Sequence, residues 1–175
     1  MRGSVIVDVR AHVRDGLEGR GAVLDVDTHH GNGTQAIFYE RDDVLTVPVH
    51  ADPNQFYPFY WGYASETGSG RGEGSNVNLP ISVGAEDPEW LAAITRACTA
   101  VKQFGPEALV VALGLDSHAD DPLKAMKVTN DGFQEAGRRI GQLKRPTVIV
   151  QEGGYLSPML GQAARSFLTG FLHAT

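Results

Sequence analysis

The stretch 21-GAVLDVDTHHGNGTQ-35 joins a short apolar run to a cluster of acids and histidines. The apolar run, over residues 22–26, is continuous rather than alternating, which is typical of a strand buried on both faces of a parallel sheet. Three similar runs follow it: 44-VLTVPV-49, 108-ALVVALG-114 and 147-TVIVQ-151. Strands that alternate with helices predict an α/β fold, in which an open parallel sheet carries flanking helices.

Helical periodicity separates and follows these runs, with apolar residues three and four positions apart. The expected helices cover residues 5–17, 89–104, 129–143 and 157–172. Gly105 ends the second helix, because glycine readily takes the left-handed conformation found after a helix C-terminus. Thr129 or Asn130 caps the third helix, and Ser157 caps the fourth with Pro158 at its first position.

The chain of 175 residues is long enough for one domain with a buried core, which we expect to span residues 1–175. The segment 50–88 differs from the rest, because it is rich in glycine, proline, asparagine and aromatic residues and has no sustained period. A loop this long inside a domain is usually functional.

Composition excludes several kinds of partner. The formal net charge is -6, and no run of lysine and arginine is longer than two residues, so no nucleic-acid surface is indicated. No window approaches the roughly 18 apolar residues of a membrane span, and 4-SVIVDVRAHV-13 is interrupted by charges, unlike a signal peptide. The single cysteine, Cys98, excludes an internal disulfide and falls on the apolar side of an expected helix. We therefore expect a soluble, cytoplasmic protein.

Polar side chains follow the strands where each one ends. Because the carboxyl ends of parallel strands meet at one edge of a sheet, ligands bind there. Asp27 and His29 are two positions apart, so on an extended segment they point the same way. Asp116, after a later strand, is a candidate third ligand. Two aspartates and a histidine leave an open coordination position, which is typical of catalytic zinc.

Four stretches together resemble the histone deacetylase and acetylpolyamine amidohydrolase family. They are 25-DVDTHHGNGTQAIFY-39, 66-ETGSGRGEGSNVNLPI-81, 113-LGLDSHADDPL-123 and 152-EGGY-155, in the same order as in the family. The resemblance runs from about residue 20 to the C-terminus. It implies an open α/β sheet of the arginase–deacetylase type. It also implies a zinc-dependent amide hydrolase that releases acetate from acetyl-lysine, an acetylpolyamine or another acetylated amine.

The resemblance also implies roles for individual residues. Asp27, His29 and Asp116 match the metal ligands, and Tyr155 matches a catalytic tyrosine that donates to the oxyanion. The other matched positions are Asp25, beside the ligands and a potassium ion; Phe38, Arg41 and Val44, at a second monovalent cation site; and Gly153, Gly154 and Leu123, at the substrate channel. Pro48 replaces the serine that usually helps to bind potassium, which weakens the expectation of K⁺ there. The resemblance leaves zinc (Zn²⁺) and Fe²⁺ both open.

One departure concerns the tandem His-His pair that supplies the general base in this family. Only about 24 residues precede Asp25, and they contain a single histidine, His12. We therefore expect the chain to match the C-terminal portion of a deacetylase domain, without its first strands and its His-His region, and to be weak or inactive. Uncovered sheet edges favour pairing, so a homo-oligomer is expected.

Two other hypotheses about the function are considered beside the amide hydrolase. One is a non-catalytic metal-binding or oligomerising remnant of the deacetylase family. The other is a binuclear manganese ureohydrolase, which 116-DSHADD-121 disfavours because its acids and histidine have the wrong spacing.

Overall fold

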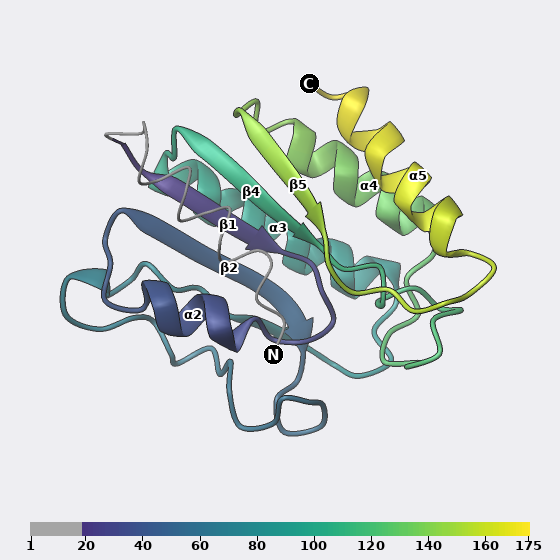
Figure 1. The fold of residues 1–175 in the computed structure, drawn as a ribbon, viewed down its shortest axis with the longest axis horizontal. Coiled ribbons are helices and arrows are strands. Elements are labelled where there is room, and N and C mark those ends of the chain that lie inside the picture. Colours follow the sequence, from purple (N-terminus) through teal and green to yellow (C-terminus); the bar gives the residue numbers. More distant parts are fainter. Residues whose placement is uncertain (1–18) are drawn as a thin grey trace.

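The computed structural model describes residues 19–175, which form one parallel five-stranded sheet with helices on both faces (Figure 1). The strands are β1 (Gly21–Asp25), β2 (Val44–Ala51), β3 (Leu79–Ile81), β4 (Ala108–Leu113) and β5 (Thr147–Gln151). The helices are α2 (Asn32–Phe38), α3 (Asp87–Phe104), α4 (Asn130–Gly141) and α5 (Leu160–Leu172), with a short 3₁₀ helix at Gly70–Gly72. The predicted α/β fold and its four strands are confirmed. The helix expected at residues 5–17 lies outside the described residues.

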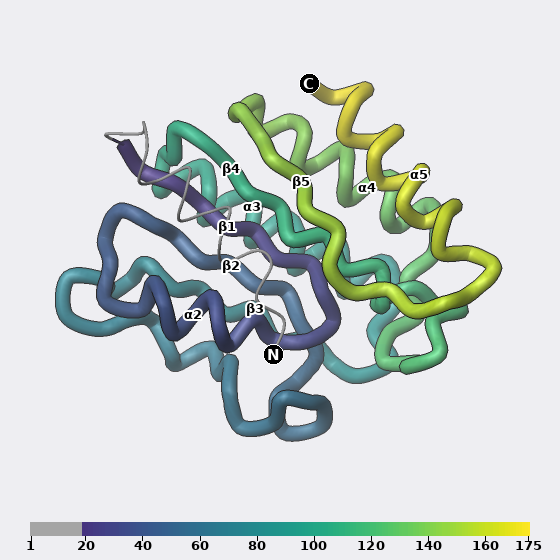
Figure 2. Tube along the Cα trace, in the orientation of Figure 1, coloured from purple at the N-terminus to yellow at the C-terminus, as the bar shows by residue number. Residues whose placement is uncertain are grey.

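The order of the strands reverses at one point of the sheet. The order is β3-β2-β1-β4-β5, with every neighbouring pair parallel. From β1 the chain moves outward to β2 and β3, and it then returns to the other side of β1 to form β4 and β5, as the tube shows (Figure 2). Ligands of open parallel sheets bind where the strand order reverses in this way, at the carboxyl ends. Here that point lies between β1 and β4.

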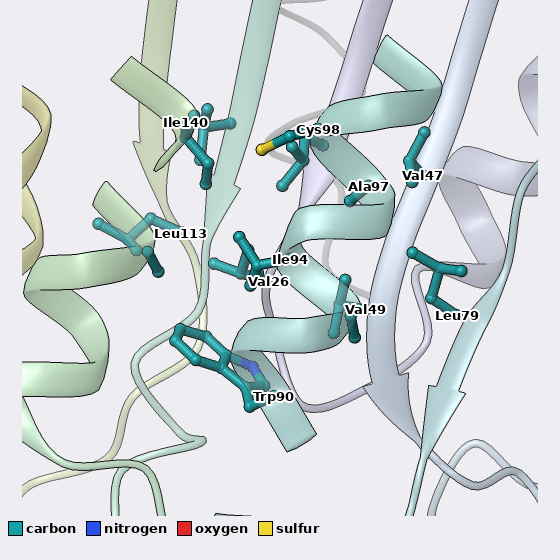
Figure 3. Packing of buried hydrophobic residues seen from close by; sticks show 14 of the residues in the cluster. Val26, Val47, Val49, Leu79, Trp90, Ile94, Ala97, Cys98, Leu113 and Ile140 are labelled. Atoms are coloured by element: carbon teal, nitrogen blue, oxygen red, sulfur yellow. The ribbon is translucent and has the colours of Figure 1, made fainter. Parts of the chain in front are cut away.

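The main core lies between the sheet and α3 (Figure 3). Trp90, Ile94 and Cys98 of α3 are buried among the strand residues Val47 and Val49. Helix α4 packs beside α3 on the same face, α5 packs against α4, and α2 covers the opposite face (Figure 1). Cys98 belongs to the core as predicted, and burial raises the pKa of its thiol to about 11.

Two of the predicted helix ends are confirmed and one is wrong. Gly105 has φ 67° and donates its backbone N–H to the Val101 carbonyl. The Thr129 hydroxyl accepts from the Gly132 amide at 3.1 Å. Ser157, however, is not the N-cap of α5, because that helix begins at Leu160 after Met159. Residues before α5 form a turn instead, in which the Ser157 carbonyl accepts from the Leu160 amide at 3.3 Å, so the helix begins later than its local sequence suggests.

Strand β5 departs from the expectation that both faces of every strand are buried. Val148 is 38% exposed, and none of the five residues of this strand is fully buried. Within residues 19–175, β5 pairs only with β4, and α2 packs over β2 rather than over this side of the sheet. In the same described range, no helix is long and apolar enough to cross a membrane.

Candidate metal centre

Three side chains converge where β1 and β4 end, and they form the candidate metal centre: Asp27, His29 and Asp116. The His29 Nδ1 atom lies 2.8 Å from Asp27 Oδ1 and 3.0 Å from Asp116 Oδ2. One ligand atom from each residue lies within 4.8 Å of the others, close enough to hold one ion. Asp27 and Asp116 are buried and His29 is partly exposed, so the cluster opens to solvent on the histidine side.

Backbone amides fix the orientation of these carboxylates. The Thr28 amide donates to Asp116 Oδ1 at 3.0 Å, and the His29 amide donates to Asp27 Oδ1 at 2.8 Å. The Asp27 amide in turn donates to Asp25 Oδ1 at 2.9 Å. Asp116 Oδ2 is buried and makes no well-aligned hydrogen bond, although His29 is near it. That oxygen is therefore available to a cation, and the donor set of two carboxylates and one imidazole fits a metal ion.

The electrostatics of the cluster also favour a cation. Burial and the negative charge of Asp27 raise the pKa of Asp25 well above its usual value. Burial likewise raises the pKa of Asp116. Burial alone would lower the pKa of His29, but the nearby carboxylates of Asp116 and Asp27 outweigh this effect and raise the pKa to about 9. Without metal, the positive charge between the two carboxylates is therefore the protonated ring of His29.

The segment after β5 passes directly over the ligands. A Cβ atom added at Gly153 would overlap the carboxylates of both Asp27 and Asp116, so only glycine fits there. Gly154 has φ +119°, a conformation that side chains rarely adopt, and it turns the chain toward Tyr155. Tyr155 is partly buried, and its amide donates to Asp121 Oδ2 at 2.9 Å. Gly153 therefore brings the backbone against the two carboxylates, and Tyr155 follows it two positions later in the chain. A role of either glycine at a substrate channel stays a prediction.

Leu123, which the resemblance places at the substrate channel, lies on the loop after β4 and is 38% exposed. Its amide donates to Asp121 Oδ1 at 2.9 Å, so Leu123 and Tyr155 are attached to the same carboxylate. Asp121 was not predicted as a site residue. It lies inside a quoted motif, but nothing in its local sequence shows which amides its side chain accepts from.

Aromatic residues of the long loop flank His29. The His29 ring lies 5.2 Å from Phe56 and 6.1 Å from Tyr57, measured between ring centroids. Tyr57, Phe59, Tyr60 and Trp61 are all exposed. The prediction that this loop is functional thus agrees with its position beside the candidate centre.

A buried polar network, which the sequence did not predict, ties that loop to the strand ends. The Gln35 side chain accepts from Asn76 and Asn78 at 3.0 and 2.9 Å and donates to Glu66 Oε2 at 2.6 Å. Glu66 Oε2 also accepts from the Gly62 amide at 3.0 Å. The members of this network are up to 43 residues apart, so no local pattern indicates it.

The positions predicted for monovalent cations fall into two places. Asp25 borders a small cavity of about 10 Å³ that Pro48 also lines, and proline offers no side-chain oxygen to a potassium ion. Phe38, Arg41 and Val44 lie toward the other end of the sheet, since Val44 is in register with the first residue of β1. There the Phe38 carbonyl accepts from the Arg41 amide at 3.0 Å. Potassium at either place stays a prediction.

A parallel α/β sheet with two aspartates and a histidine at its reversal point is typical of proteins that bind a metal ion at the carboxyl ends of their strands. Comparison with known proteins makes this class specific. The family model described as "Histone deacetylase domain" matches residues 4–171, and the chain belongs to this family.

Individual relatives agree with this assignment. The chain is 49% identical over 152 residues to an acetylpolyamine amidohydrolase from Burkholderia pseudomallei, which covers 87% of this chain and 45% of that protein. It is 44% identical to acetylpolyamine amidohydrolase 1 from Pseudomonas aeruginosa, covering 87% of this chain and 44% of the relative. A crystal structure of acetylpolyamine aminohydrolase from Burkholderia pseudomallei superposes with a TM-score of 0.87 at 48% identity, over 89% of this chain and 46% of that one. The chain thus spans about 45% of the length of the curated relatives it matches.

Proposed function

We propose that the chain carries the metal centre of a zinc-dependent amide hydrolase that removes acetate from an acetylated amine. The observation that supports this most directly is the convergence of Asp27, His29 and Asp116 at the reversal point of the sheet, with one oxygen of Asp116 available. The donor set suits Zn²⁺, and Fe²⁺ remains the alternative metal. The substrate class follows from the relatives, two of which are named acetylpolyamine amidohydrolases; acetyl-lysine is the other candidate.

Each part of the site has a chemical task in this proposal. Bound zinc would polarise the amide carbonyl and lower the pKa of water at the centre. Asp27, His29 and Asp116 would hold the ion. Tyr155 would donate its hydroxyl proton in a hydrogen bond to the carbonyl oxygen as negative charge develops there, and removal of one such donor typically costs about 10²–10³ in rate. The rings of Phe56 and Tyr57, beside His29, would narrow the approach to the centre on the histidine side.

The described residues leave the general base unassigned. His30 and His50 are buried, with side chains directed at each other 4.7 Å apart between ring centroids. The His118 side chain is also buried, where it accepts from the Asp120 amide and stacks on Phe133. Since general-base assistance contributes about 10²–10⁴ in rate, we propose that this chain by itself turns over slowly or not at all.

The first experiment measures metal content after purification without chelators, together with turnover of acetyl-lysine and acetylpolyamine substrates by the same sample. About one zinc per chain, and turnover that is lost in Tyr155→Phe, would support the hydrolase. Zinc without turnover would identify a non-catalytic metal-binding member of the family. Failure to retain metal after Zn²⁺ is added would refute the ligand assignment. Asp116→Asn should lose the metal, whereas the exposed neighbour Asp120→Asn, a matched control, should keep it.

We also propose that a second copy of the chain covers the outer edge of β5. Support comes from the exposed apolar side chains Val148 and Leu156, which are 38% and 93% exposed. We propose separately that the protein is cytoplasmic, as expected from the sequence, and fractionation of cells that express the chain would test this location.

A further inference from the structure

Asp121 is a buried residue whose two carboxylate oxygens each accept a hydrogen bond from a backbone amide. It is 1% exposed, with Oδ2 accepting from Tyr155 and Oδ1 accepting from Leu123, both at 2.9 Å. Within residues 19–175 it forms no ion pair with a lysine, arginine or histidine. Burying a carboxylate is costly, so its placement indicates that these two amide contacts matter to the structure around it.

The two contacts join loops that come from different parts of the chain. The segment after β5 is attached to β4 as far as Gly153, through Glu152 N to Leu113 O at 2.9 Å and Leu115 N to Gly153 O at 3.0 Å. Gly154 then turns the chain, and the next backbone amide, that of Tyr155, donates to Asp121. The hydrogen bond therefore fixes the backbone just after a glycine whose conformation side chains rarely adopt.

Asp121 is itself tied to the metal ligand Asp116. The four residues between them form successive turns, with His118 N donating to Leu115 O at 3.2 Å and Asp121 N donating to His118 O at 2.9 Å. The segment also donates from Ala119 N to Val128 O at 2.9 Å, which anchors it to the core. A short, hydrogen-bonded path thus leads from the metal centre to the carboxylate and on to Tyr155.

We propose that Asp121 is a positioning residue for Tyr155. Its carboxylate sets the place from which the tyrosine hydroxyl reaches the metal centre, and it makes the Tyr155 loop and the Leu123 loop move as one unit. This rests on the proposed function only in that Tyr155 is taken to act at that centre. Asp121 itself touches neither the metal ligands nor, in this proposal, the substrate.

The test compares Asp121→Asn with Asp120→Asn, which makes the same chemical change at an exposed neighbouring residue. Asparagine keeps the shape, but its amide group can accept only one of the two backbone hydrogen bonds and presents an N–H to the other. Three quantities are measured on the full chain: hydrogen exchange at the Tyr155 amide, zinc affinity, and turnover split into kcat and KM.

The expected result for Asp121→Asn is exchange at the Tyr155 amide that is about 10-fold or more faster, since a hydrogen bond to a charged group is lost. Zinc affinity should stay within about 3-fold of wild type. The kcat should fall by about 10-fold with KM nearly constant, because the misplaced group, the Tyr155 hydroxyl, stabilises charge that develops only in the transition state. The double variant with Tyr155→Phe should turn over no more slowly than Tyr155→Phe alone, since Asp121 acts through that hydroxyl. Asp120→Asn should change none of the three.

Additive losses in the double variant, or unchanged exchange at Tyr155, would overturn the proposal. If wild type binds zinc without turnover, kcat cannot test the inference, and the hydrolase activity proposed above is judged separately. In that case the four proteins are compared by their affinity for acetohydroxamate, a ligand for the bound zinc. If Asp121→Asn weakens this affinity as much in the Tyr155→Phe background as in wild type, the inference is again overturned. Should Asp121→Asn fail to fold, Asp121→Glu replaces it. That variant keeps both oxygens, and faster exchange at Tyr155 with unchanged zinc affinity is the supporting result.

Discussion

Zinc binding at the metal centre is expected to displace a proton from His29. In the metal-free protein, His29 Nδ1 lies within 3.0 Å of a carboxylate oxygen of both Asp27 and Asp116, and the pKa of the ring is raised to about 9. The same nitrogen lies beside an oxygen of each carboxylate, so it is the ring atom best placed to bind a metal there. A metal ligand must be deprotonated, so the ion and the proton compete for one site.

The raised pKa sets the size of this competition. At pH 7 a histidine with a pKa of about 9 is roughly 99% protonated, so each zinc should release about one proton, whereas a histidine with the usual pKa of about 6.5 would release about 0.2. Between pH 6 and pH 8 the apparent zinc affinity should rise about 90-fold, against about 4-fold for an unperturbed ring. By the same linkage, the protonated ring stabilises the metal-free fold below about pH 6.5, and this contribution is lost as the pH rises through about 9.

Calorimetry of the metal-free chain with zinc chloride, in buffers of different ionisation enthalpy at pH 7, counts the protons released. Chelator competition at pH 6, 7 and 8 gives the affinity. Asp25→Asn is measured alongside, because the pKa of that buried carboxyl is also raised and its proton would add to the count. His173→Gln, at an exposed position after α5, should behave as wild type. Release of about 0.2 proton with a 4-fold change in affinity would refute the geometry assigned to His29.

Three further predictions concern the fold. Burial lowers the pKa of His50 to about 4, so the folded protein is stabilised by the neutral ring above about pH 6.5 and loses this stabilisation as the pH falls toward 4. The free energy of unfolding in urea should therefore fall by about 2 kcal/mol between pH 7 and pH 5, and His50→Gln should remove this fall. Gly137→Ala should cost about 1–3 kcal/mol in urea unfolding, because the added methyl group would overlap a carbonyl of α5. Gly161→Ala, where nothing lies within 4 Å, should instead stabilise the chain by up to about 1 kcal/mol. Val148→Lys on β5 should convert an oligomer to a monomer in light scattering, whereas Val83→Lys, at a similarly exposed position near the opposite edge, should not.

The parts of the fold that sequence could predict are those with strong local patterns. The continuous apolar runs identified four of the five strands, and the rule that ligands bind at the carboxyl ends of parallel strands placed Asp27, His29 and Asp116 together. Both inferences depend only on short-range periodicity and on one topological regularity. They succeed because each predicted ligand follows directly after an apolar strand, so the segment that identifies the strand also locates the ligand.

Two elements were missed because their local sequences are weak. Helix α2 has seven residues, a glycine at its N-cap and no side-chain cap, so it depends on packing, chiefly that of Phe38 against the sheet. Strand β3 has three residues with Pro80 in the middle, which is tolerated because β3 is paired only with β2 among the described residues. Tertiary contacts decide both elements, and a single sequence does not display them.

The side chains that support the site were missed for a related reason. Gln35, Glu66 and Asn78 form hydrogen bonds across long separations in the chain, and each would be an ordinary surface residue by its type. Asp121 gives the same difficulty, since it stands among several acids of similar local context. Only the fold distinguishes the acid that is 1% exposed from its exposed neighbour Asp120. Ligands have a recognisable spacing, whereas the residues that orient them do not.

The arrangement of glycines and carboxylates explains why the metal centre and the end of the sheet depend on each other. A Cβ atom at Gly114 would overlap the backbone of Asp27, and one at Gly153 would overlap the carboxylates of Asp27 and Asp116. The chain therefore closes on the ligands from β4 and from β5, which leaves their carboxylates little room to turn away from one another. Like charges held this closely repel, and a positive charge between them offsets the repulsion. His29 supplies that charge when it is protonated, and a metal ion would supply it otherwise, so the packing that prepares the site also creates its need for a cation.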